Sequence, residues 1–396
     1  MSVQGYGVSE RIFMLDCARK YFTPEWIKRL ITEIAAVGYN VIVIHFSEDM
    51  GMRLESKTYP WLAGGDHSLC VFGTANGRPE DDGKFITQDE MADIVRHAYS
   101  LGVEVIPSLD SPGHMNYVVK KYNEHYGTDI ANYFHKDGKV SVVQGSSIYK
   151  EQSALSHSRG IDITNPEAVK FAESLYLEYG KFFRCLGCKR FNISADELLG
   201  FGESIDDSVS KWQNLEHWDE YAKDLTGNER AVAYDAFILY VNGVCAMLRE
   251  LGYESILMWN DDAYRSFDTG WQGVCGLDKS IDILYWSTVA NNGLNTPRFY
   301  LTQGHRIYNF ALEYTYYTLY PDRAPTKHTP EEIEEEWNPL VFDSADTERN
   351  LSPEDGTLLG AGICLWSDTP NAMEEDELLV NIRPYFTAIA KKAKGE

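Results

Sequence analysis

Two adjacent carboxylic acids, Asp196 and Glu197, close a short apolar segment that begins at Phe191. Like charges repel in a dry pocket, so one member of such a pair is expected to have a raised pKa. A general acid needs this property, because it must hold a proton near neutral pH and deliver it to a leaving oxygen. The pair therefore predicts acid catalysis, with a simple helix cap as the alternative interpretation.

Because Asp196 and Glu197 are adjacent in the sequence, they fit only some of the mechanisms by which a glycosidic bond is hydrolysed. Neighbouring residues of a strand point in opposite directions, so Asp196 and Glu197 do not fit an acid and a nucleophile that face each other across a glycosidic bond. Another nucleophile is needed, and the 2-acetamido group of an amino sugar can supply it. Its carbonyl oxygen attacks the anomeric carbon while one carboxyl protonates the leaving group and the other holds the amide. The pair thus indicates hydrolysis of a terminal 2-acetamido sugar.

Short apolar segments alternate with amphipathic ones along the chain, which is the pattern of βα units around a parallel sheet. Strands are predicted at residues 12–16, 41–46, 103–109, 191–194, 255–259, 281–286, 307–312 and 361–366. One helix runs from Pro24 to a stop at Gly38, and another from a cap at Thr87 to just before Gly102. Further helices are predicted at 166–185, 229–251 and 374–392.

Eight strands without an intervening linker predict the α/β class and a single-domain (β/α)8 TIM barrel over residues 1–396, with a core of about 11–392. A doubly wound open sheet is the alternative, but no glycine-rich phosphate loop follows the first strand. The long connections 47–86 and 116–164 are of a length that usually serves function.

Reactive and aromatic side chains recur at the C-terminal ends of the predicted strands, where barrels of this kind build their active sites. They are Asp16, Arg19, His45, Glu48, Asp49, Asp110, His114, Asp196, Glu197, Trp259, Asn260, Asp261, Trp286, Tyr316, Tyr317, Trp366, Ser367 and Asp368. Any single one reads equally well as a helix cap or a core residue. Their recurrence at one face predicts a catalytic pocket whose aromatic rings fit the apolar faces of sugars.

Composition narrows the class of protein. The 60 acidic and 36 basic residues give a formal charge of −24, which argues against nucleic acid and anionic membranes as partners. The seven cysteines are scattered and read as reduced thiols, and Cys185 with Cys188 forms only half a zinc motif. We therefore expect neither a metal nor a cofactor. No signal-like stretch opens the sequence, so as written it predicts a cytoplasmic protein, with secretion as the alternative if a leader was removed.

Six ordered motifs resemble glycoside hydrolase family 20, the β-N-acetylhexosaminidases and their relatives. They lie at residues 14–19, 40–49, 110–114, 196–197, 259–261 and 366–368, so the resemblance covers nearly the whole chain. The likeness is strongest to compact, single-domain bacterial members. It implies a retaining exo-β-N-acetylglucosaminidase that acts on oligosaccharides or glycans with a terminal N-acetylhexosamine.

The resemblance also implies roles for individual residues. Glu197 is the general acid and base, Asp196 receives the acetamido N–H, and a tyrosine hydroxyl donates to the acetamido carbonyl. Tyr317 fits that role best, with Tyr316 one register away as the alternative. The residues that bind or wall the sugar are Arg19, Asp49, Trp259, Asp261, Trp286, Trp366 and Asp368. His114, backed by Glu48 or Asp49, would sit behind Glu197 and tune its proton affinity.

Several positions depart from the family pattern. Ser194 and Ala195 stand where many relatives have two glycines, and Glu48 stands where Asp is usual. Asp368 replaces the Glu that grips O4 and O6 of the sugar in typical hexosaminidases, and a shorter side chain widens the pocket. A lacto-N-biosidase, or a hydrolase of 6-substituted GlcNAc, is therefore the second hypothesis. A non-catalytic sugar-binding barrel is the third, and the presence of both carboxylates disfavours it.

Overall fold

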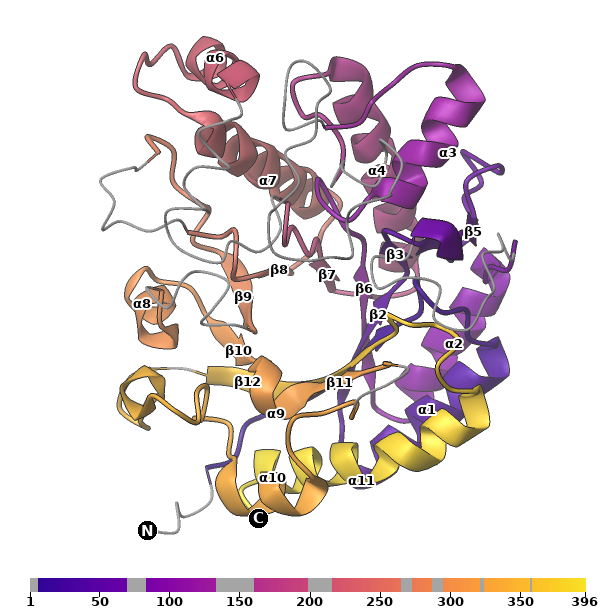
Figure 1. Ribbon diagram of the computed structural model, residues 1–396, viewed down its shortest axis with the longest axis vertical. Helices are drawn as coiled ribbons and strands as arrows, with labels where there is room; N and C mark the ends of the chain where they lie inside the picture. The colour runs from indigo at the N-terminus through magenta and orange to yellow at the C-terminus, as the bar shows by residue number, and fades with distance from the viewer. Residues whose placement is uncertain are drawn as a thin grey trace.

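The structure, a computed structural model, describes residues 6–69, 83–132, 160–198, 216–264, 273–286, 295–320, 324–356 and 358–396. Its centre is a closed barrel of parallel strands with helices around the outside (Figure 1). The barrel strands are β1 (Glu10–Asp16), β2 (Val41–His45), β6 (Glu104–Ser108), β7 (Arg190–Asn192), β8 (Ser255–Trp259), β9 (Ile281–Tyr285), β10 (Ile307–Asn309) and β12 (Leu358–Trp366). Pairing of β1 with both β2 and β12 closes the ring, which confirms the predicted (β/α)8 barrel.

The seventh strand is split, in contrast to the prediction of one strand over 307–312. β10 ends at Asn309 because the side-chain oxygen of Asn309 accepts a hydrogen bond from the N–H of Ala311 at 2.8 Å and turns the chain. After the short helix α9 (Leu312–Thr315), the chain returns to the sheet as β11 (Tyr316–Thr318). β12 pairs with β10 in its first half and with β11 in its second, so the two pieces share the place of one strand.

Five long helices cover the barrel: α1 (Pro24–Val37), α2 (Gln88–Ser100), α4 (Pro166–Cys185), α7 (Ala233–Glu250) and α11 (Glu375–Ala393). Shorter helices are α3 (Asn116–Tyr126), α6 (Glu216–Thr226), α8 (Pro297–Thr302) and α10 (Pro330–Glu336). Thr87 caps α2 and Gly38 ends α1 with a φ of 104°, as the sequence predicted, and the structure adds Thr23 as the cap of α1. α7 starts later than the predicted residue 229, because the Asp235 carboxylate accepts the N–H of Val232 and sets the start there.

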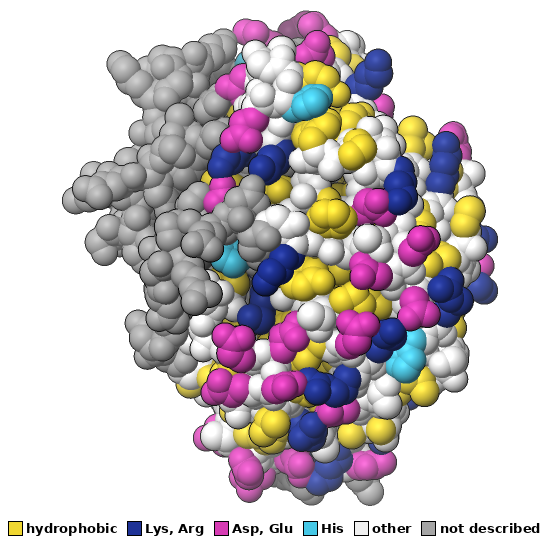
Figure 2. Space-filling view, turned by 90° about the vertical axis from the view of Figure 1, so that its right-hand side faces the viewer, with side chains coloured by type: hydrophobic (Ala, Val, Ile, Leu, Met, Phe, Trp, Pro, Cys, Tyr) yellow, Lys and Arg dark blue, Asp and Glu magenta, His cyan; other side chains and the backbone are white. Residues whose placement is uncertain are grey.

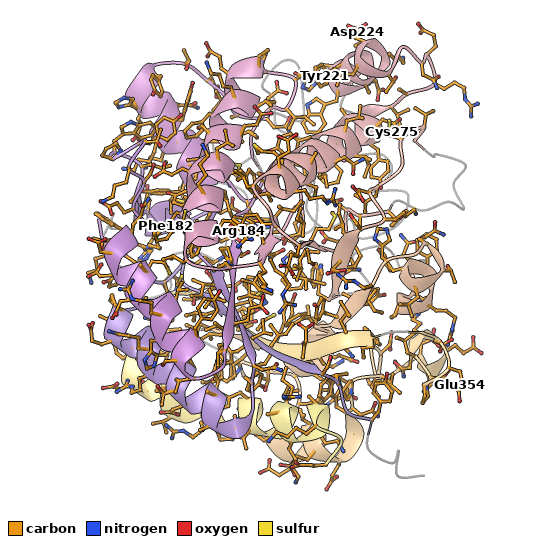
Figure 3. All side chains as sticks on the ribbon, turned by 180° about the vertical axis from the view of Figure 1, so that it is seen from behind. Phe182, Arg184, Tyr221, Asp224, Cys275 and Glu354 are labelled. Atoms are coloured by element: carbon orange, nitrogen blue, oxygen red, sulfur yellow. The ribbon has the colours of Figure 1, made fainter. Side chains whose placement is uncertain are left out.

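Hydrogen bonds at the two ends of α7 tie it to its neighbours, and two of the residues involved, Cys275 and Arg184, are labelled in the view from behind (Figure 3). Near its N-terminal end, Asp235 also accepts the N–H of Cys275 at 2.6 Å. Just after its C-terminal end, the carbonyl of Gly252 accepts a bond from Arg184 of α4 at 3.0 Å. These bonds, together with apolar packing, hold the outer layer of the barrel.

Side chains of the strands alternate between two buried layers, as expected for a pleated sheet. Phe13 and Leu15 of β1 belong to the apolar layer under the helices, whereas Ile12 and Met14 fill the barrel interior. The interior ends in an aromatic group of Trp259, Trp286 and Trp366 at the C-terminal ends of the strands. That end of the barrel is where the predicted reactive residues gather.

Arg190 closes the opposite, N-terminal end of the barrel. Its guanidinium donates to Glu104 at 2.9 and 2.8 Å, to Glu10 at 2.5 Å and to the hydroxyl of Tyr308 at 2.9 Å. A cavity of about 610 Å³ lies at this end and is lined largely by charged groups of this kind. Since these charges are paired with one another, they stabilise the N-terminal end of the barrel, and we assign no reaction to that end.

The connection between β2 and α2 forms a small antiparallel sheet of β3 (Ser47–Glu48), β4 (Gly51–Met52) and β5 (Gly64–Gly65). Arg53 is fully buried beneath it and donates to the carbonyls of Ala18 at 3.0 Å and Lys84 at 2.8 Å. A side chain at position 65 would overlap the guanidinium, so a larger residue there would displace Arg53. The buried Arg53 thereby fixes the segment that carries Glu48 and Asp49 against the end of β1.

The helical face around α2, α3 and α4 carries acidic and basic side chains mixed with apolar ones (Figure 2). Ion pairs of this kind link neighbouring helices, for example Lys28 of α1 with Asp93 of α2 at 2.8 Å. The strong negative net charge is therefore not concentrated on this face. Among the helices in the described parts of the chain, none is long and apolar enough to cross a membrane.

Candidate active site

The predicted catalytic pair, Asp196 and Glu197, lies on a tight turn and not on a strand. β7 ends at Asn192, and the backbone of Ser194, Ala195 and Glu197 then takes positive φ angles of 54°, 56° and 46°. The expectation that strand alternation separates Asp196 from Glu197 was therefore wrong, because the chain leaves the extended conformation before it reaches them. Non-glycine residues with positive φ are strained, and such strain gathers at functional sites.

His114 brings the two acids together. Its Nε2 lies 3.3 Å from Glu197 Oε2 and 3.8 Å from Asp196 Oδ2. On the other side of the ring, Nδ1 lies 2.6 Å from Glu48 Oε1 and 3.2 Å from Asp49 Oδ2. The structure thus places His114 behind Glu197, in contact with both residues that the sequence proposed as its support.

The electrostatics of this group favour a charged histidine. Burial alone lowers the pKa of His114, but the carboxylates of Glu48 and Asp49 outweigh burial and raise it well above its ordinary value. Burial likewise opposes ionisation of Glu48, but Arg19 and His114 lower its pKa well below the usual range. Burial raises the pKa of Asp196 well above its ordinary value, and the nearby Asp110 adds to that effect. These effects favour a protonated Asp196 next to a cationic His114.

A second buried histidine, His45, contacts the same acidic group. Its Nε2 lies 3.2 Å from Asp110 Oδ2 and 3.3 Å from Glu48 Oε2. Burial lowers the pKa of His45, but these two carboxylates more than offset it and raise the pKa to about 9. His45 is therefore cationic at neutral pH and offers a proton on each ring nitrogen.

Arg19 occupies the other side of Glu48. It donates to Asp16 Oδ2 at 2.8 Å and lies 3.1 Å from Glu48 Oε2, and its guanidinium sits 5.5 Å from the ring centre of Trp366. Asp16 also accepts the N–H of Ser367 at 3.0 Å, which joins the ends of β1 and β12. Arg19 is thus held at the rim of the pocket with its side chain partly exposed.

Aromatic rings wall the pocket. Trp259 lies 5.9 Å from Trp366, and Trp286 is stacked on Tyr316 at 5.9 Å with an interplanar angle of 8°. Tyr316 also lies 5.7 Å from Trp366. These four rings form an aromatic group of the kind that packs against the apolar face of a sugar ring.

Several buried polar atoms of this pocket have no hydrogen-bond partner among the described residues. Among them are Asp196 Oδ1 and the indole nitrogens of Trp259 and Trp366, and His114 Nε2 is another, although it has ion-pair contacts with both acids. Buried polar groups are almost always paired in folded proteins, so unpaired ones in a pocket indicate groups that a ligand satisfies. One acceptor and two donors therefore point to a polar ligand at this place.

Tyr316, and not Tyr317, faces the pocket. In the parallel pairing of β11 with β12, Tyr316 lies opposite Cys364 of the barrel interior, and Tyr317 lies opposite Leu365 of the outer layer. Opposed residues of a sheet point to the same face, so Tyr317 turns outward, where its ring contacts Tyr385 of α11 at 5.3 Å. The preference for Tyr317 was wrong, and the alternative, Tyr316, takes its place.

Asp261 was expected to bind substrate, but both of its carboxylate oxygens accept hydrogen bonds from the protein itself. Oδ2 accepts the N–H of Glu197 at 2.7 Å, and Oδ1 accepts the indole N–H of Trp286 at 3.1 Å. The next residue, Asp262, accepts the N–H of Leu198 at 3.0 Å. The two acids after β8 therefore support the catalytic turn. Sequence reasoning missed Asp262, although its place beside Asp261 at a strand end was a usable signal.

Two groups of described residues have ligand atoms within 4.8 Å of one another, as a metal site requires. One is His45 with Glu48 and Asp110, and the other is Glu48 with Asp49 and His114. In both groups a cationic imidazole already lies next to two carboxylates and offsets part of their negative charge.

Asp368 lies close enough to Arg19, Asp16 and Glu48 for their charges to shift its pKa. Burial raises its pKa to about 6, with Arg19 opposing the rise and the two acids adding to it. A carboxyl that keeps its proton in the folded state contributes stability that is fully present below about pH 4 and lost as the pH rises through about 6.

We therefore expect Asp368→Asn to raise the melting temperature at about pH 8 and to change it little at about pH 4. Melting curves of both proteins at the two pH values measure the effect, with Asp224→Asn on the exposed side of α6 as the matched control (Figure 3). An equal gain at both pH values would show that the charge of Asp368 is not destabilising.

A parallel barrel that collects two acids, a histidine and a wall of tryptophans at the C-terminal ends of its strands defines the class of barrel glycoside hydrolases. The sequence model described as "Glycosyl hydrolase family 20, catalytic domain" matches residues 9–393. The chain therefore belongs to glycosyl hydrolase family 20, which confirms the resemblance seen in its motifs.

Known proteins of similar sequence are named as two kinds of enzyme. A lacto-N-biosidase of Bifidobacterium bifidum is 26% identical over 93% of this chain, and a beta-N-acetylhexosaminidase of Cellulomonas fimi is 29% identical over 52% of it. The chain spans only 27% and 41% of the lengths of these two relatives.

Solved structures show the same fold. Dispersin B is 22% identical with a TM-score of 0.67, covering 97% of this chain and 99% of its own. An exo β-N-acetylglucosaminidase of Vibrio harveyi, in complex with N-acetylglucosamine, is 21% identical with a TM-score of 0.67 and covers 98% of this chain and 55% of its own.

Proposed function

We propose that this protein is a retaining exo-β-N-acetylglucosaminidase that removes terminal β-linked GlcNAc from oligosaccharides or glycans by substrate-assisted catalysis. The observation that carries the proposal is the pairing of Asp196 and Glu197 against His114, in a pocket walled by tryptophans. Asp196 presents an unpaired, buried oxygen to that pocket. Membership of family 20 and the names of its relatives support the same activity.

In the first step, Glu197 donates its proton to the glycosidic oxygen while the acetamido carbonyl oxygen attacks the anomeric carbon. The bond from the anomeric carbon to the leaving oxygen breaks, and a cyclic oxazolinium ion forms. Asp196 accepts the acetamido N–H, and Tyr316 donates to the acetamido oxygen. Burial raises the pKa of Tyr316 well above its ordinary value, so the hydroxyl keeps the proton that it donates.

In the second step, Glu197 takes a proton from water, and the water oxygen attacks the anomeric carbon from the side that the leaving group vacated. The ring of the intermediate opens, the acetamido group is restored and the product keeps the β configuration. Asp196 acts here as the carboxylate, after releasing its own proton to solvent, and the positive charge of the oxazolinium favours that ionised form. Asp196 thus stabilises the intermediate more than the bound substrate.

A lacto-N-biosidase is the second candidate, and two observations favour it. The relative from Bifidobacterium bifidum matches almost the whole chain, and Asp368 at the rim is one methylene shorter than the Glu of typical hexosaminidases. A shorter side chain next to Arg19 leaves room for a substituent on the terminal GlcNAc.

The first experiment compares an aryl β-GlcNAc with an aryl β-lacto-N-bioside as substrates, with a GlcNAc-thiazoline as inhibitor of acetamido participation. Turnover of the first substrate, blocked by the thiazoline, is the expected result. Turnover of the second alone would replace the proposal with the second candidate, and turnover of neither would leave a sugar-binding barrel.

Tyr316→Phe is expected to lower kcat by about 10- to 100-fold, because it removes a hydrogen bond that strengthens as charge develops on the acetamido oxygen. Tyr317→Phe is the matched control, one residue away on the outer face of the barrel, and should keep kcat within about twofold. Steady-state kinetics on the aryl β-GlcNAc measure both. A large loss in Tyr317→Phe with none in Tyr316→Phe would reverse the assignment made from the strand register.

A further inference from the structure

A network of buried polar side chains lies next to the turn that carries Asp196 and Glu197, and the mechanism above does not use it. Its members Ser194, Ser108, Asn192 and His45 are each at most 1% exposed. The Ser108 hydroxyl lies 2.9 Å from His45 Nδ1, 2.9 Å from Asn192 Nδ2 and 3.2 Å from the Ser194 hydroxyl. This network therefore joins β2 and β6 to the end of β7, where the turn begins.

The direction of these hydrogen bonds follows from the charge of His45. A cationic imidazole donates through Nδ1 to the Ser108 oxygen, and the amide of Asn192 donates to the same oxygen. Both lone pairs of Ser108 are then occupied, so its own O–H is directed to Ser194. Asn192 completes the loop, since its Oδ1 accepts the N–H of Ser194 at 3.0 Å.

The turn that this network of side chains holds in place is strained. Ser194 and Ala195 have φ angles of 54° and 56°, a conformation that is unfavourable for a residue with a side chain and accessible to glycine. Two successive residues of this kind persist only where the surroundings over-determine the backbone. The hydrogen bonds to Ser194 supply that constraint from below.

Close packing constrains the turn from the opposite side. A side chain on Gly113 would come within 2.7 Å of the carbonyl oxygen of Asp196, so the two backbones are in direct contact. Gly113 immediately precedes His114. A small shift of the turn would therefore move Asp196 and Glu197 relative to the imidazole that serves both of them.

We propose that Ser194 is a positioning residue: its hydroxyl, which lies 3.2 Å from the Ser108 hydroxyl and accepts a hydrogen bond from Asn192 Nδ2 at 3.3 Å, fixes the strained turn so that Asp196 and Glu197 face His114. The inference rests on the proposed function and deepens it. It also gives a physical reason for a serine at a position where many relatives have glycine: the hydroxyl replaces backbone freedom with a specific anchor.

The test uses Ser194→Gly and Ser108→Ala, which remove the anchor from either end, and Ala195→Gly as the matched control. Each glycine variant relieves one strained residue, but only Ser194→Gly loses hydrogen bonds. Ser108→Ala leaves the turn sequence intact, so it tests the anchor independently if the glycine variant folds poorly. Each protein is assayed on two aryl β-GlcNAc substrates, one with a good and one with a poor leaving group.

A poor leaving group needs the proton of Glu197, whereas a good one departs without it. For Ser194→Gly and Ser108→Ala we expect kcat on the poor leaving group to fall about 10- to 100-fold, with a smaller loss on the good one and little change in KM. Ala195→Gly should raise the melting temperature and keep the wild-type ratio of the two rates.

Wild-type ratios in both anchor variants would overturn the proposal, and so would equal losses on both substrates that match the fraction of unfolded protein. In those cases the wild-type enzyme still turns over, and the proposed function stands. A wild-type protein that cleaves neither substrate would overturn the proposed function and this inference with it.

Discussion

Glu197→Gln is expected to abolish nearly all turnover of an aryl β-GlcNAc with a poor leaving group, with a loss of about 10²- to 10⁴-fold in kcat. The amide keeps the size and shape of the side chain beside His114, whose Nε2 lies 3.3 Å from the carboxyl oxygen, but it has no proton to donate. A substrate with a good leaving group should lose much less, because its departure does not depend on protonation.

Single-turnover and steady-state kinetics on the two substrates measure this difference. Glu124→Gln, at the exposed end of α3, is the matched control and should leave both rates unchanged. KM should change little in Glu197→Gln, because the ground state gains no charge at that position. A variant that keeps more than about a tenth of the wild-type rate on the poor leaving group would show that another residue is the acid.

Asp196→Asn is expected to lower kcat by about 10- to 150-fold on acetamido substrates, which corresponds to a hydrogen bond to a charged group. The asparagine oxygen still accepts the acetamido N–H, but it carries no negative charge to stabilise the oxazolinium. Binding of a thiazoline inhibitor, which resembles that intermediate, should weaken by a similar factor. Binding of free GlcNAc should change less, because the sugar carries no charge.

The stability of the same variant gives an independent check. Burial raises the pKa of Asp196, so its carboxylate is costly in the folded protein, and Asp196→Asn should melt at the wild-type temperature or above near neutral pH. Asp224→Asn on α6 again serves as the control for both kinetics and melting. Unchanged thiazoline affinity would contradict the assigned role, and a lowered melting temperature would attribute the loss of rate to misfolding.

Local pattern was enough to predict the barrel. Apolar runs such as 255–259 and caps such as Thr87 with Glu90 depend on neighbours a few residues away, so they are visible in the sequence. The strand ends also predicted which acids would gather, since every strand of a parallel barrel delivers its C-terminal residue to the same face. Asp196, Glu197, His114 and Glu48 were found in this way.

Strand alternation, in contrast, failed at the catalytic pair. Serine and alanine disfavour positive φ, so the residue types at 194–195 do not predict the turn that the structure shows. The turn is imposed by contacts from other strands, from Asp261 and Asp262 after β8 and from Ser108 on β6. Those contacts exist only once the barrel has closed.

The sequence by itself determined the fold class, the family and the set of acids, because these depend on local periodicity and on motif order. Only the tertiary structure decided between Tyr316 and Tyr317, since the register of β11 against Cys364 and Leu365 sets which ring faces inward. It also decided that Asp261 supports Glu197, and that His45 and Ser108 lie under the turn. Side-chain direction and long-range hydrogen bonds are properties of packed neighbours, and sequence spacing does not contain them.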